Sequence, residues 1–299
     1  MTYFYIGYPK SGATRLRNFL EETDGLTLLK ISQAGIAQDL VGSPAPITHS
    51  EEAANRHVRE VLDASPSGKP KVVFSERLSG LCFCGHYDAL SIADRIHRFC
   101  PDGRVIISIR EQHSMISSIY RWYVRNGGTL PPELFLNPRE SITYPRFSWQ
   151  AYEYHHLILH YAQRFGRENV LVLPQEDLKA DSRAYFRTFC DFLGIDCPAD
   201  IPDQIANRGI SNEETEKRRL LNLVRKNADA DAFRDPTPLQ HPLLMLLIQP
   251  WVRLFAPLIA RRNRHVKFIR EHFTGSYRDS NQRLSDYLGR DLSRIGYEM

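Results

Sequence analysis

The amino-acid sequence predicts an α/β fold, with a parallel β-sheet flanked by helices on both faces and helical additions toward the C-terminus. Short apolar segments alternate with amphipathic helical segments, which is typical of βαβ units. Residues 104–109 are almost continuously apolar and rich in β-branched side chains, as in a strand covered on both faces. The right-handed crossover between parallel strands favours the same arrangement. We expect residues 1–299 to form one domain, with residues 200–275 as the helical addition.

Each expected element rests on a local pattern. The first strand, residues 2–7, is apolar and aromatic and ends at a glycine. The helix that follows, residues 13–22, places its large apolar side chains on one side. The other expected strands are 71–75, 104–109 and 169–173, and the other expected helices are 50–62, 89–99, 114–125, 148–165, 182–193 and 213–229. The last of these helices is highly charged, so we expect it to be exposed. Residues 24–70 otherwise carry turn signals, and whether they form a lid stays open.

The composition excludes some classes of protein. The chain is 42% hydrophobic and 25% charged, which is ordinary for a soluble globular protein. A net charge of +4 suits an anionic ligand but does not identify a nucleic-acid binder. Five cysteines without a framework spacing favour reduced thiols in the cytoplasm. The first strand pattern begins at once, which argues against a signal peptide and secretion.

The loop after the first strand has the features of an anion site. It consists of Tyr8, Pro9, Lys10, Ser11, Gly12, Ala13 and Thr14. A small-residue turn that opens a helix directs unpaired N–H groups and the positive end of the helix dipole at a ligand. Lys10 adds a positive charge and Thr14 a hydroxyl donor. The order differs from the Walker pattern, because the lysine precedes Ser-Gly. The alternative is a strand–helix turn that simply requires small residues.

A second polar segment follows the strong strand 104–109. Arg110 stands at the carboxyl end of this strand, and Ser118 lies eight residues later, two turns into the next helix. In an open parallel sheet, ligands bind at the carboxyl ends of the strands. We therefore expect Lys10 and Arg110 to face one polyanion. Taken alone, Arg110 could be an ordinary surface arginine and Ser118 an ordinary helix serine.

Together these segments resemble the sulfotransferases that use 3′-phosphoadenosine 5′-phosphosulfate (PAPS). The first family motif is similar to Y-P-K-S-G-T-T-W, which residues 8–15 match in most positions. The second motif is a strand followed by an arginine and, eight positions on, a serine, as at Arg110 and Ser118. Residues 175–181 look like the Y-E-D-L segment of the family, and residues 277–297 are similar to the ends of bacterial members. The resemblance implies a P-loop-like α/β fold.

The resemblance also implies a role for each matching residue. The residues that would hold the 5′-phosphosulfate are Lys10, Ser11, Gly12, Ala13 and Thr14. Arg110 and Ser118 would hold the 3′-phosphate, and Tyr277 with Arg278 would close over it like the basic C-terminal loop of the family. The resemblance implies no metal requirement, with PAPS as the donor co-substrate.

Three positions depart from the family pattern. Ala13 stands where a threonine is usual, which removes a hydroxyl donor. Arg15 replaces a tryptophan that stacks on adenine in many members, and Gln175 replaces the tyrosine of Y-E-D. Adenine stacking must therefore come from another group or from the Arg15 guanidinium itself.

The implied reaction needs a stabiliser for the leaving phosphate oxygen and a base for the acceptor. Lys10 is the candidate for the first role. Glu76 is the candidate base, because it follows the strand 71–75 near where many relatives carry histidine, and burial can raise the pKa of a carboxyl group. The alternative is that Glu76 pairs with Arg77 or another arginine. His86 and His49 are weaker candidates, and Cys82, Cys84 and His86 are too few ligands for a typical zinc site.

Residues 241–268 form a strongly apolar segment that ends in basic residues. Prolines at 250 and 257 and an arginine at 253 interrupt it, which argues against a membrane-spanning helix. A buried helical hairpin is favoured, and peripheral contact with anionic lipid is the alternative.

The resulting hypothesis is a cytoplasmic PAPS-dependent sulfotransferase. Its acceptor would be a hydroxyl (or amine) of a glycan or small molecule. The alternatives are a nucleotide-dependent kinase of related fold and a non-catalytic, membrane-associated binding protein. The acceptor and the oligomeric state stay open.

Overall fold

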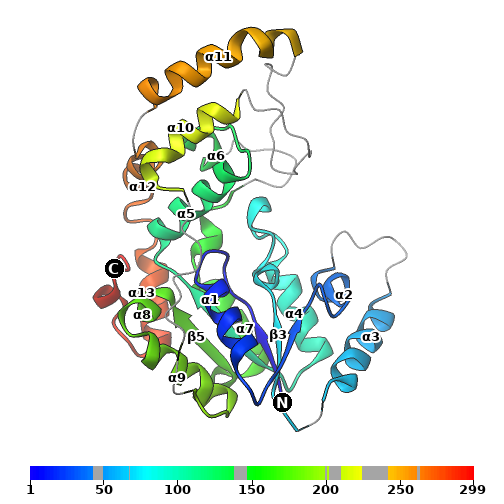
Figure 1. The fold of residues 1–299 in the computed structure, drawn as a ribbon. Helices are drawn as coiled ribbons and strands as arrows, with labels where there is room; N and C mark the ends of the chain where they lie inside the picture. The colour runs from blue at the N-terminus through cyan, green and yellow to red at the C-terminus, as the bar shows by residue number, and fades with distance from the viewer. Residues whose placement is uncertain are drawn as a thin grey trace. The chain divides into compact units, whose positions relative to one another are not determined.

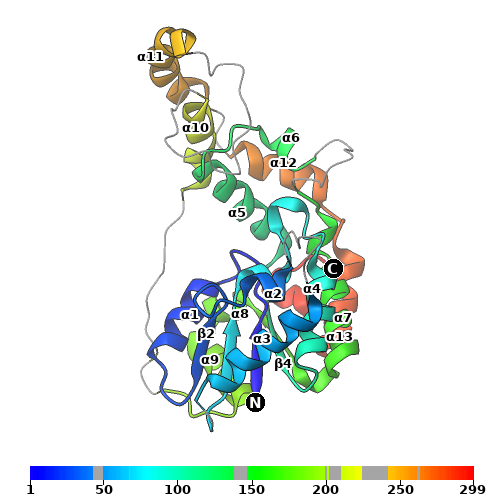
Figure 2. The same cartoon turned by 90° about the vertical axis from the view of Figure 1, so that its right-hand side faces the viewer.

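The computed structural model describes residues 1–42, 50–66, 68–137, 147–198, 201, 210–223, 242–260 and 263–299 (Figures 1 and 2). The chain divides into two compact units. Unit 1 consists of Met1–Glu111, Ser148–Ala206 and Tyr277–Met299. Unit 2 consists of Gln112–Phe147 and Asn207–Ser276. The expectation of one domain over residues 1–299, with residues 200–275 as an addition, stays a prediction.

Unit 1 is built on a parallel sheet with five strands among the described residues, in the order β2-β3-β1-β4-β5. The strands are β1 (Thr2–Tyr5), β2 (Thr27–Lys30), β3 (Lys71–Phe74), β4 (Arg104–Ile109) and β5 (Val170–Pro174). Strand β1 pairs with β3 on one side and with β4 on the other. After β1 the chain continues toward β2, whereas after β4 it continues toward β5, so the connections diverge between β1 and β4. Ligands of open α/β sheets bind at such a switch point.

Helices cover both faces of this sheet, which confirms the predicted α/β fold class. The helices on one face are α1 (Ala13–Glu22), α8 (Gln175–Ala180) and α9 (Ser182–Leu193). On the other face α4 (Ala89–Phe99) packs against α7 (His155–Phe165). The remaining helices of the unit are α2 (Ala37–Val41), α3 (Glu51–Ala64) and α13 (Arg278–Leu288), with short 3₁₀ turns at η1 (Glu76–Ser79), η2 (Cys82–Cys84), η3 (Gln150–Tyr152), η4 (Arg167–Asn169) and η6 (Leu292–Ile295).

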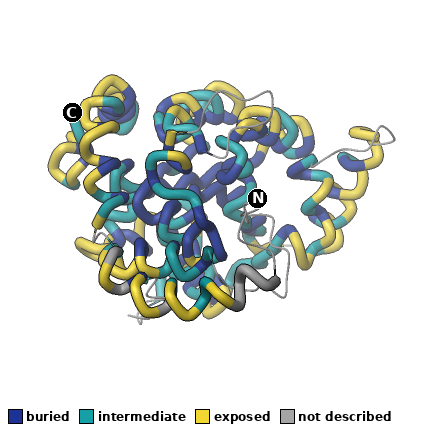
Figure 3. The backbone as a smooth tube through the Cα atoms, turned by 90° about the horizontal axis from the view of Figure 1, so that it is seen from above, coloured by how far each residue is buried: buried dark blue, intermediate teal, exposed yellow. Residues whose placement is uncertain are grey.

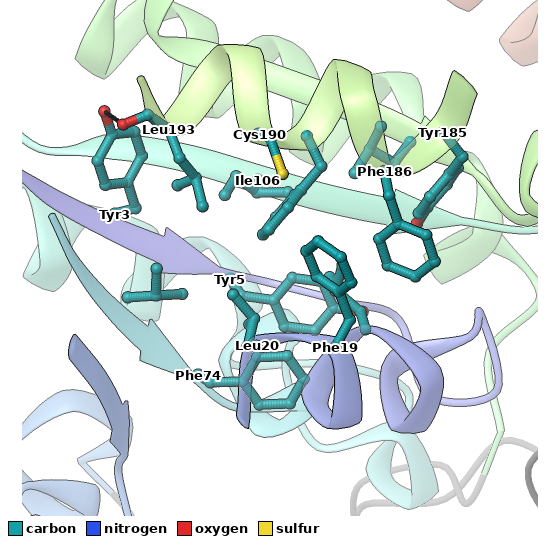
Figure 4. Close-up of a cluster of buried hydrophobic side chains, with 14 of the residues drawn as sticks. Tyr3, Tyr5, Phe19, Leu20, Phe74, Ile106, Tyr185, Phe186, Cys190 and Leu193 are labelled. Atoms are coloured by element: carbon teal, nitrogen blue, oxygen red, sulfur yellow. Dashed lines mark hydrogen bonds between the residues drawn. The ribbon is translucent and has the colours of Figure 1, made fainter. Parts of the chain in front are cut away.

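Alternating strand residues build the core between the sheet and the helices α1 and α9 (Figure 4). Tyr5 stacks on Phe74 of the neighbouring strand, with ring centroids 4.2 Å apart. Phe19 of α1 stacks on Phe186 of α9 at 4.1 Å. Strands β1, β3 and β4 are buried except at their first residues, and Figure 3 marks the buried parts of the chain in dark blue. This packing fixes α1, and therefore the loop before it, against the end of β1.

Unit 2 is helical in its described part. Its helices are α5 (Gln112–Arg125), α6 (Pro132–Phe135), α10 (Asn212–Asn222), α11 (Pro242–Ile259) and α12 (Arg264–Phe273). Helices α10 and α12 pack on α5. The expectation that the charged helix is exposed is wrong for Glu216 and Arg219, which are buried and form an ion pair with 2.7 Å between Oε1 and Nη2. Arg264 adds a second partner for Glu216, at 3.0 Å.

One predicted helix begins later than expected. The segment 148–165 becomes α-helical only at His155, after a 3₁₀ turn over Gln150–Tyr152. Two tyrosine hydroxyls donate hydrogen bonds to backbone carbonyls of this segment. The Tyr277 hydroxyl donates to the Trp149 carbonyl at 3.2 Å, and the Tyr8 hydroxyl donates to the Ala151 carbonyl at 3.1 Å. These contacts hold the segment in a tighter turn than an α-helix. The helices over residues 13–22, 89–99 and 182–193 are confirmed at their predicted bounds.

None of the described helices is both long enough and apolar enough to span a membrane.

Candidate functional site

The loop between β1 and α1 has an unusual backbone. Lys10 has φ 71°, a left-handed conformation that a side chain makes costly and that clusters at functional sites. Gly12 has φ 101° and takes the N-cap position of α1. No side chain among the described residues caps this helix, and its first turn holds no acidic residue. The first N–H groups of α1 and its positive dipole end are therefore suited to an anion.

The Ser11 hydroxyl points into the core. Its Oγ donates to the Tyr8 carbonyl at 2.5 Å and lies 2.6 Å from Oγ of Ser108 on β4, which in turn lies 2.5 Å from the Tyr5 hydroxyl. The Ser11 N–H also donates to the Tyr8 carbonyl, at 3.2 Å. The hydroxyl and the N–H of Ser11 thus both form hydrogen bonds within the loop. The contact of Ser11 with a phosphosulfate stays a prediction.

Arg110 meets the loop although it lies 100 residues away in the chain. Its Nη1 donates to the Lys10 carbonyl at 3.3 Å, and its own carbonyl accepts from the Tyr154 hydroxyl at 2.7 Å. The structure therefore brings Lys10 and Arg110 together at the switch point between β1 and β4. This is the arrangement that the sequence predicts from the carboxyl ends of the two strands.

The guanidinium of Arg110 lacks an anionic partner within the described part of the chain. It forms no salt bridge there, and its Nε is buried without a hydrogen-bond acceptor. Burial lowers the pKa of Arg110, against the opposing effect of the nearby Glu176 carboxylate, but an arginine stays protonated. Buried polar groups are almost always satisfied in folded proteins, and an anionic ligand would satisfy the Nε of Arg110.

The nearby carboxylate of Glu176 is engaged elsewhere. One oxygen accepts from the Glu111 N–H at 3.2 Å, and the other accepts from the Tyr297 hydroxyl at 3.2 Å. The adjacent Asp177 binds Arg290 through both oxygens at 2.6 Å. These contacts attach the C-terminal tail to α8.

Glu76 begins η1 directly after β3, the strand beside β1. Burial raises its pKa, while the positive charge of Lys10 and a hydrogen bond from the Lys10 N–H oppose the rise. The alternative that Glu76 pairs with Arg77 is wrong, because Arg77 pairs with Asp88, with 2.5 Å between Nη2 and Oδ2. Glu76 is thus a carboxyl group with a raised pKa close to Lys10, as a general base requires.

His86 is a poorer base in this structure. Its ring is buried, Nδ1 lies 2.8 Å from the Ser79 carbonyl, and burial lowers its pKa to about 4. The carbonyl can only accept, so Nδ1 carries the proton, and the neutral ring packs against Tyr8. His49 lies outside the described residues. No cluster of three or more metal-ligating side chains occurs in the described part of the chain.

Two further predicted residues lie on α1, near the loop. Thr14 is half-buried in the first turn. The Arg15 guanidinium lies over the Phe186 ring, 5.8 Å from its centroid. Gln175, which departs from the family pattern, lies against Gly12, and its Oε1 is buried without a hydrogen-bond partner in the described chain. The departure from the family tyrosine at Gln175 did not predict this buried polar group beside the loop.

The remaining predicted residues have other partners or lie in unit 2. Tyr277 is buried, with its hydroxyl on the Trp149 carbonyl. Arg278 pairs with Glu298 at 3.2 Å. Ser118 is buried in α5 of unit 2, so its pairing with Arg110 spans the two units and stays a prediction.

Comparison with known proteins finds a family likeness for part of the chain. Residues 84–199 match the model of the sulfotransferase family. This segment contains β4, Arg110, α5 and the segment from β5 to α9. This segment is therefore similar to the sulfotransferase family. No curated protein matches its sequence.

One solved sulfotransferase shares the fold at low sequence identity. A sulfotransferase from Alicyclobacillus acidocaldarius is 18% identical, with a TM-score of 0.58 over 98% of this chain and 97% of that one. At this identity the likeness shows the fold alone. A sulfotransferase domain from the Synechococcus olefin synthase (19% identity, 84% and 93% covered, TM-score 0.41) and a mouse sulfotransferase complexed with PAP (18%, 95% and 87%, 0.44) are less similar in structure.

Proposed function

We propose that the chain is a PAPS-dependent sulfotransferase that moves a sulfuryl group to a hydroxyl or amine of a glycan or small-molecule acceptor. One observation carries the proposal: the half-buried Arg110 has no carboxylate partner in the described chain and lies against the uncapped loop that holds Lys10. A bisphosphorylated nucleotide has anions at both ends, which suits two separate cationic groups at one edge of the sheet.

Each residue at this edge has a proposed role. The loop N–H groups from Gly12 to Thr14 and the Lys10 ammonium bind the 5′-phosphosulfate. Arg110 binds the 3′-phosphate, with Ser118, Tyr277 and Arg278 as further proposed contacts. The guanidinium of Arg15 offers a flat surface for adenine, in the place of the family tryptophan.

The transfer itself is an in-line displacement at sulfur. The bond between sulfur and the donor phosphate oxygen breaks as the bond between sulfur and the acceptor oxygen or nitrogen forms. Glu76 takes the proton that the acceptor loses, and Lys10 stabilises the negative charge on the leaving phosphate oxygen. As with phosphoryl transfer, the protein mainly positions the groups and stabilises charge, so we propose no metal in this step.

The proposed setting is the cytoplasm, with free thiols at all five cysteines of the structure. Peripheral contact of residues 241–268 with a membrane belongs to the same proposal and is developed below.

Ligand-induced stabilisation tests the proposal without knowledge of the acceptor. Adenosine 3′,5′-bisphosphate should raise the melting temperature in the absence of magnesium, because a ligand at 100 times its Kd stabilises the native state by about 2.7 kcal/mol. A response only to ATP with magnesium would contradict the proposal and favour a kinase. Binding of the bisphosphate without sulfate transfer to any acceptor in cell extract would favour a non-catalytic binding protein.

A further inference from the structure

Helix α11 carries an exposed apolar face. Leu247, Trp251, Leu254 and Leu258 follow one another at helical spacing, and each keeps between 62% and 76% of its surface exposed. Phe255 extends this face and stacks on Trp251, with ring centroids 6.0 Å apart. The prediction that this segment is buried is therefore wrong for these five side chains. The sequence could not show it, because the same apolar pattern suits burial or exposure to lipid.

The apolar face is the main concentration of exposed hydrophobic residues on the described chain. Five of its nine exposed large hydrophobic side chains lie on α11. Within unit 2 the helix packs against α10 (Figures 1 and 2). Ala256 is fully buried. A contiguous apolar patch of this kind, unlike scattered exposed residues, usually marks an interaction surface.

The basic residues in and after α11 favour an anionic lipid surface as its partner. No acidic residue occurs in the sequence between Asp235 and Glu271, whereas six basic residues do. They are Arg253, Arg261, Arg262, Arg264, Lys267 and Arg270. Of these, Arg264 is bound to Glu133 and Glu216, and Lys267 pairs with Glu271 at 3.7 Å. A second copy of the chain would bring two such basic segments together, whereas an anionic lipid surface complements them.

The dimensions of α11 favour a position in the plane of a membrane. The helix has 18 residues and is therefore about 27 Å long, whereas a spanning helix needs about 20 apolar residues. It also contains Pro250 and Pro257. An exposed helix face of aromatic and leucine residues, followed in the chain by basic residues, suits interfacial binding.

We propose that α11 is an interfacial helix that binds this protein to membranes rich in anionic phospholipid, through Leu247, Trp251, Leu254, Phe255 and Leu258. This membrane binding extends one part of the proposed function, the peripheral membrane contact of residues 241–268. It does not depend on whether the protein uses PAPS. It adds the helix face, the mode of binding and the class of lipid.

Vesicle sedimentation of the full chain tests the proposal. Vesicles of phosphatidylcholine with phosphatidylserine should bind the protein, phosphatidylcholine alone should bind it much less, and high salt should weaken binding because it screens the charges. Brominated phospholipid should quench Trp251, and this quenching should disappear in Trp251→Phe. The double variant Trp251→Glu, Leu254→Glu should lose at least about tenfold in vesicle affinity, because charged residues enter the bilayer at high cost.

A matched control uses exposed apolar residues elsewhere. Leu90 on α4 and Leu134 on α6 are each about half exposed, so Leu90→Glu with Leu134→Glu should keep vesicle binding. Equal loss in both double variants, or no binding to phosphatidylserine vesicles at low salt, would overturn the proposal. A concentration-dependent dimer that only the α11 variant dissociates would instead assign the face to a second copy. Stabilisation by adenosine 3′,5′-bisphosphate in the same preparations shows separately whether the proposed function stands.

Discussion

His86 should make unit 1 sensitive to acid. The imidazole is buried, its Nδ1 lies on the Ser79 carbonyl, and burial lowers its pKa from 6.5 to about 4. The unfolded chain therefore takes up a proton near pH 6.5, whereas the folded protein takes it up only near pH 4. As the pH falls through this window the unfolded state binds more protons, so the free energy of unfolding decreases.

The magnitude follows from the two pKa values. A difference of about 2.5 pKa units corresponds to at most about 3.4 kcal/mol once the pH lies below both values. Between pH 7.5 and pH 5.0 the loss from His86 is about 2 kcal/mol, with little of it above pH 7. This is a large part of the 5–15 kcal/mol that stabilises an ordinary domain.

The assay compares the chain with His86→Asn. Asparagine tolerates the left-handed backbone of this position, at φ 55°, and places an N–H donor where Nδ1 stands, but it does not titrate. Urea unfolding is measured at pH 7.5 and pH 5.0. In unit 1 the fluorescence of Trp149 reports unfolding when Trp122 and Trp251 are replaced by phenylalanine in both proteins.

Other titrating groups cancel in this comparison, including His155, whose pKa is also lowered to about 4 by burial. We expect the parent to lose about 2 kcal/mol more than His86→Asn between the two pH values. If both proteins lose the same stability, His86 is not a buried neutral imidazole. The reason for ranking it below Glu76 as the general base would then no longer hold.

Three other substitutions test the proposed site. Lys10→Met should lower kcat about 10²- to 10³-fold in a sulfate-transfer assay, and a loss below tenfold would exclude Lys10 from charge stabilisation. Because burial raises the pKa of Glu76, its charge costs stability as the pH rises through that pKa. Glu76→Gln should therefore melt higher than the parent at pH 8, with a gap that narrows toward pH 4, and should lose transfer activity; a lower melting temperature at pH 8 would refute this. Gly12→Ala should weaken nucleotide binding, since φ is 101° and its Cβ would lie 3.2 Å from Leu178. Gly25→Ala, at φ 88° with nothing within 4 Å, is the matched control, and equal effects would contradict a special role for Gly12.

The proximity of Lys10 and Arg110 could be predicted, because it follows from the position of each residue relative to a strand in the sequence. Each residue comes directly after a buried strand, and parallel strands present their carboxyl ends at one edge of the sheet. The sequence pattern also located α1 and α9, whose apolar spacing matches the face that they bury. Strand β2 was missed, because a four-residue edge strand that is only half-buried leaves almost no periodic signal.

Contacts between distant residues could not be predicted from local patterns. Ser11 was expected to face a ligand, yet its hydroxyl is held by Ser108 and the Tyr8 carbonyl inside the core. The roles of Tyr154 and Tyr297 at the site depend on tertiary packing that no spacing encodes. Family resemblance indicated the segment around Glu176, but only the structure shows which donors occupy its carboxylate.

The most direct test of the proposed function is titration calorimetry with two nucleotides and one variant. Adenosine 3′,5′-bisphosphate should bind the parent without metal and bind Arg110→Met at least about tenfold more weakly, since a buried charged hydrogen bond to phosphate is lost. Adenosine 5′-monophosphate, which lacks the 3′-phosphate, should bind the parent and the variant alike. Equal affinity of the two proteins for the bisphosphate would show that Arg110 does not hold the second phosphate of a shared ligand.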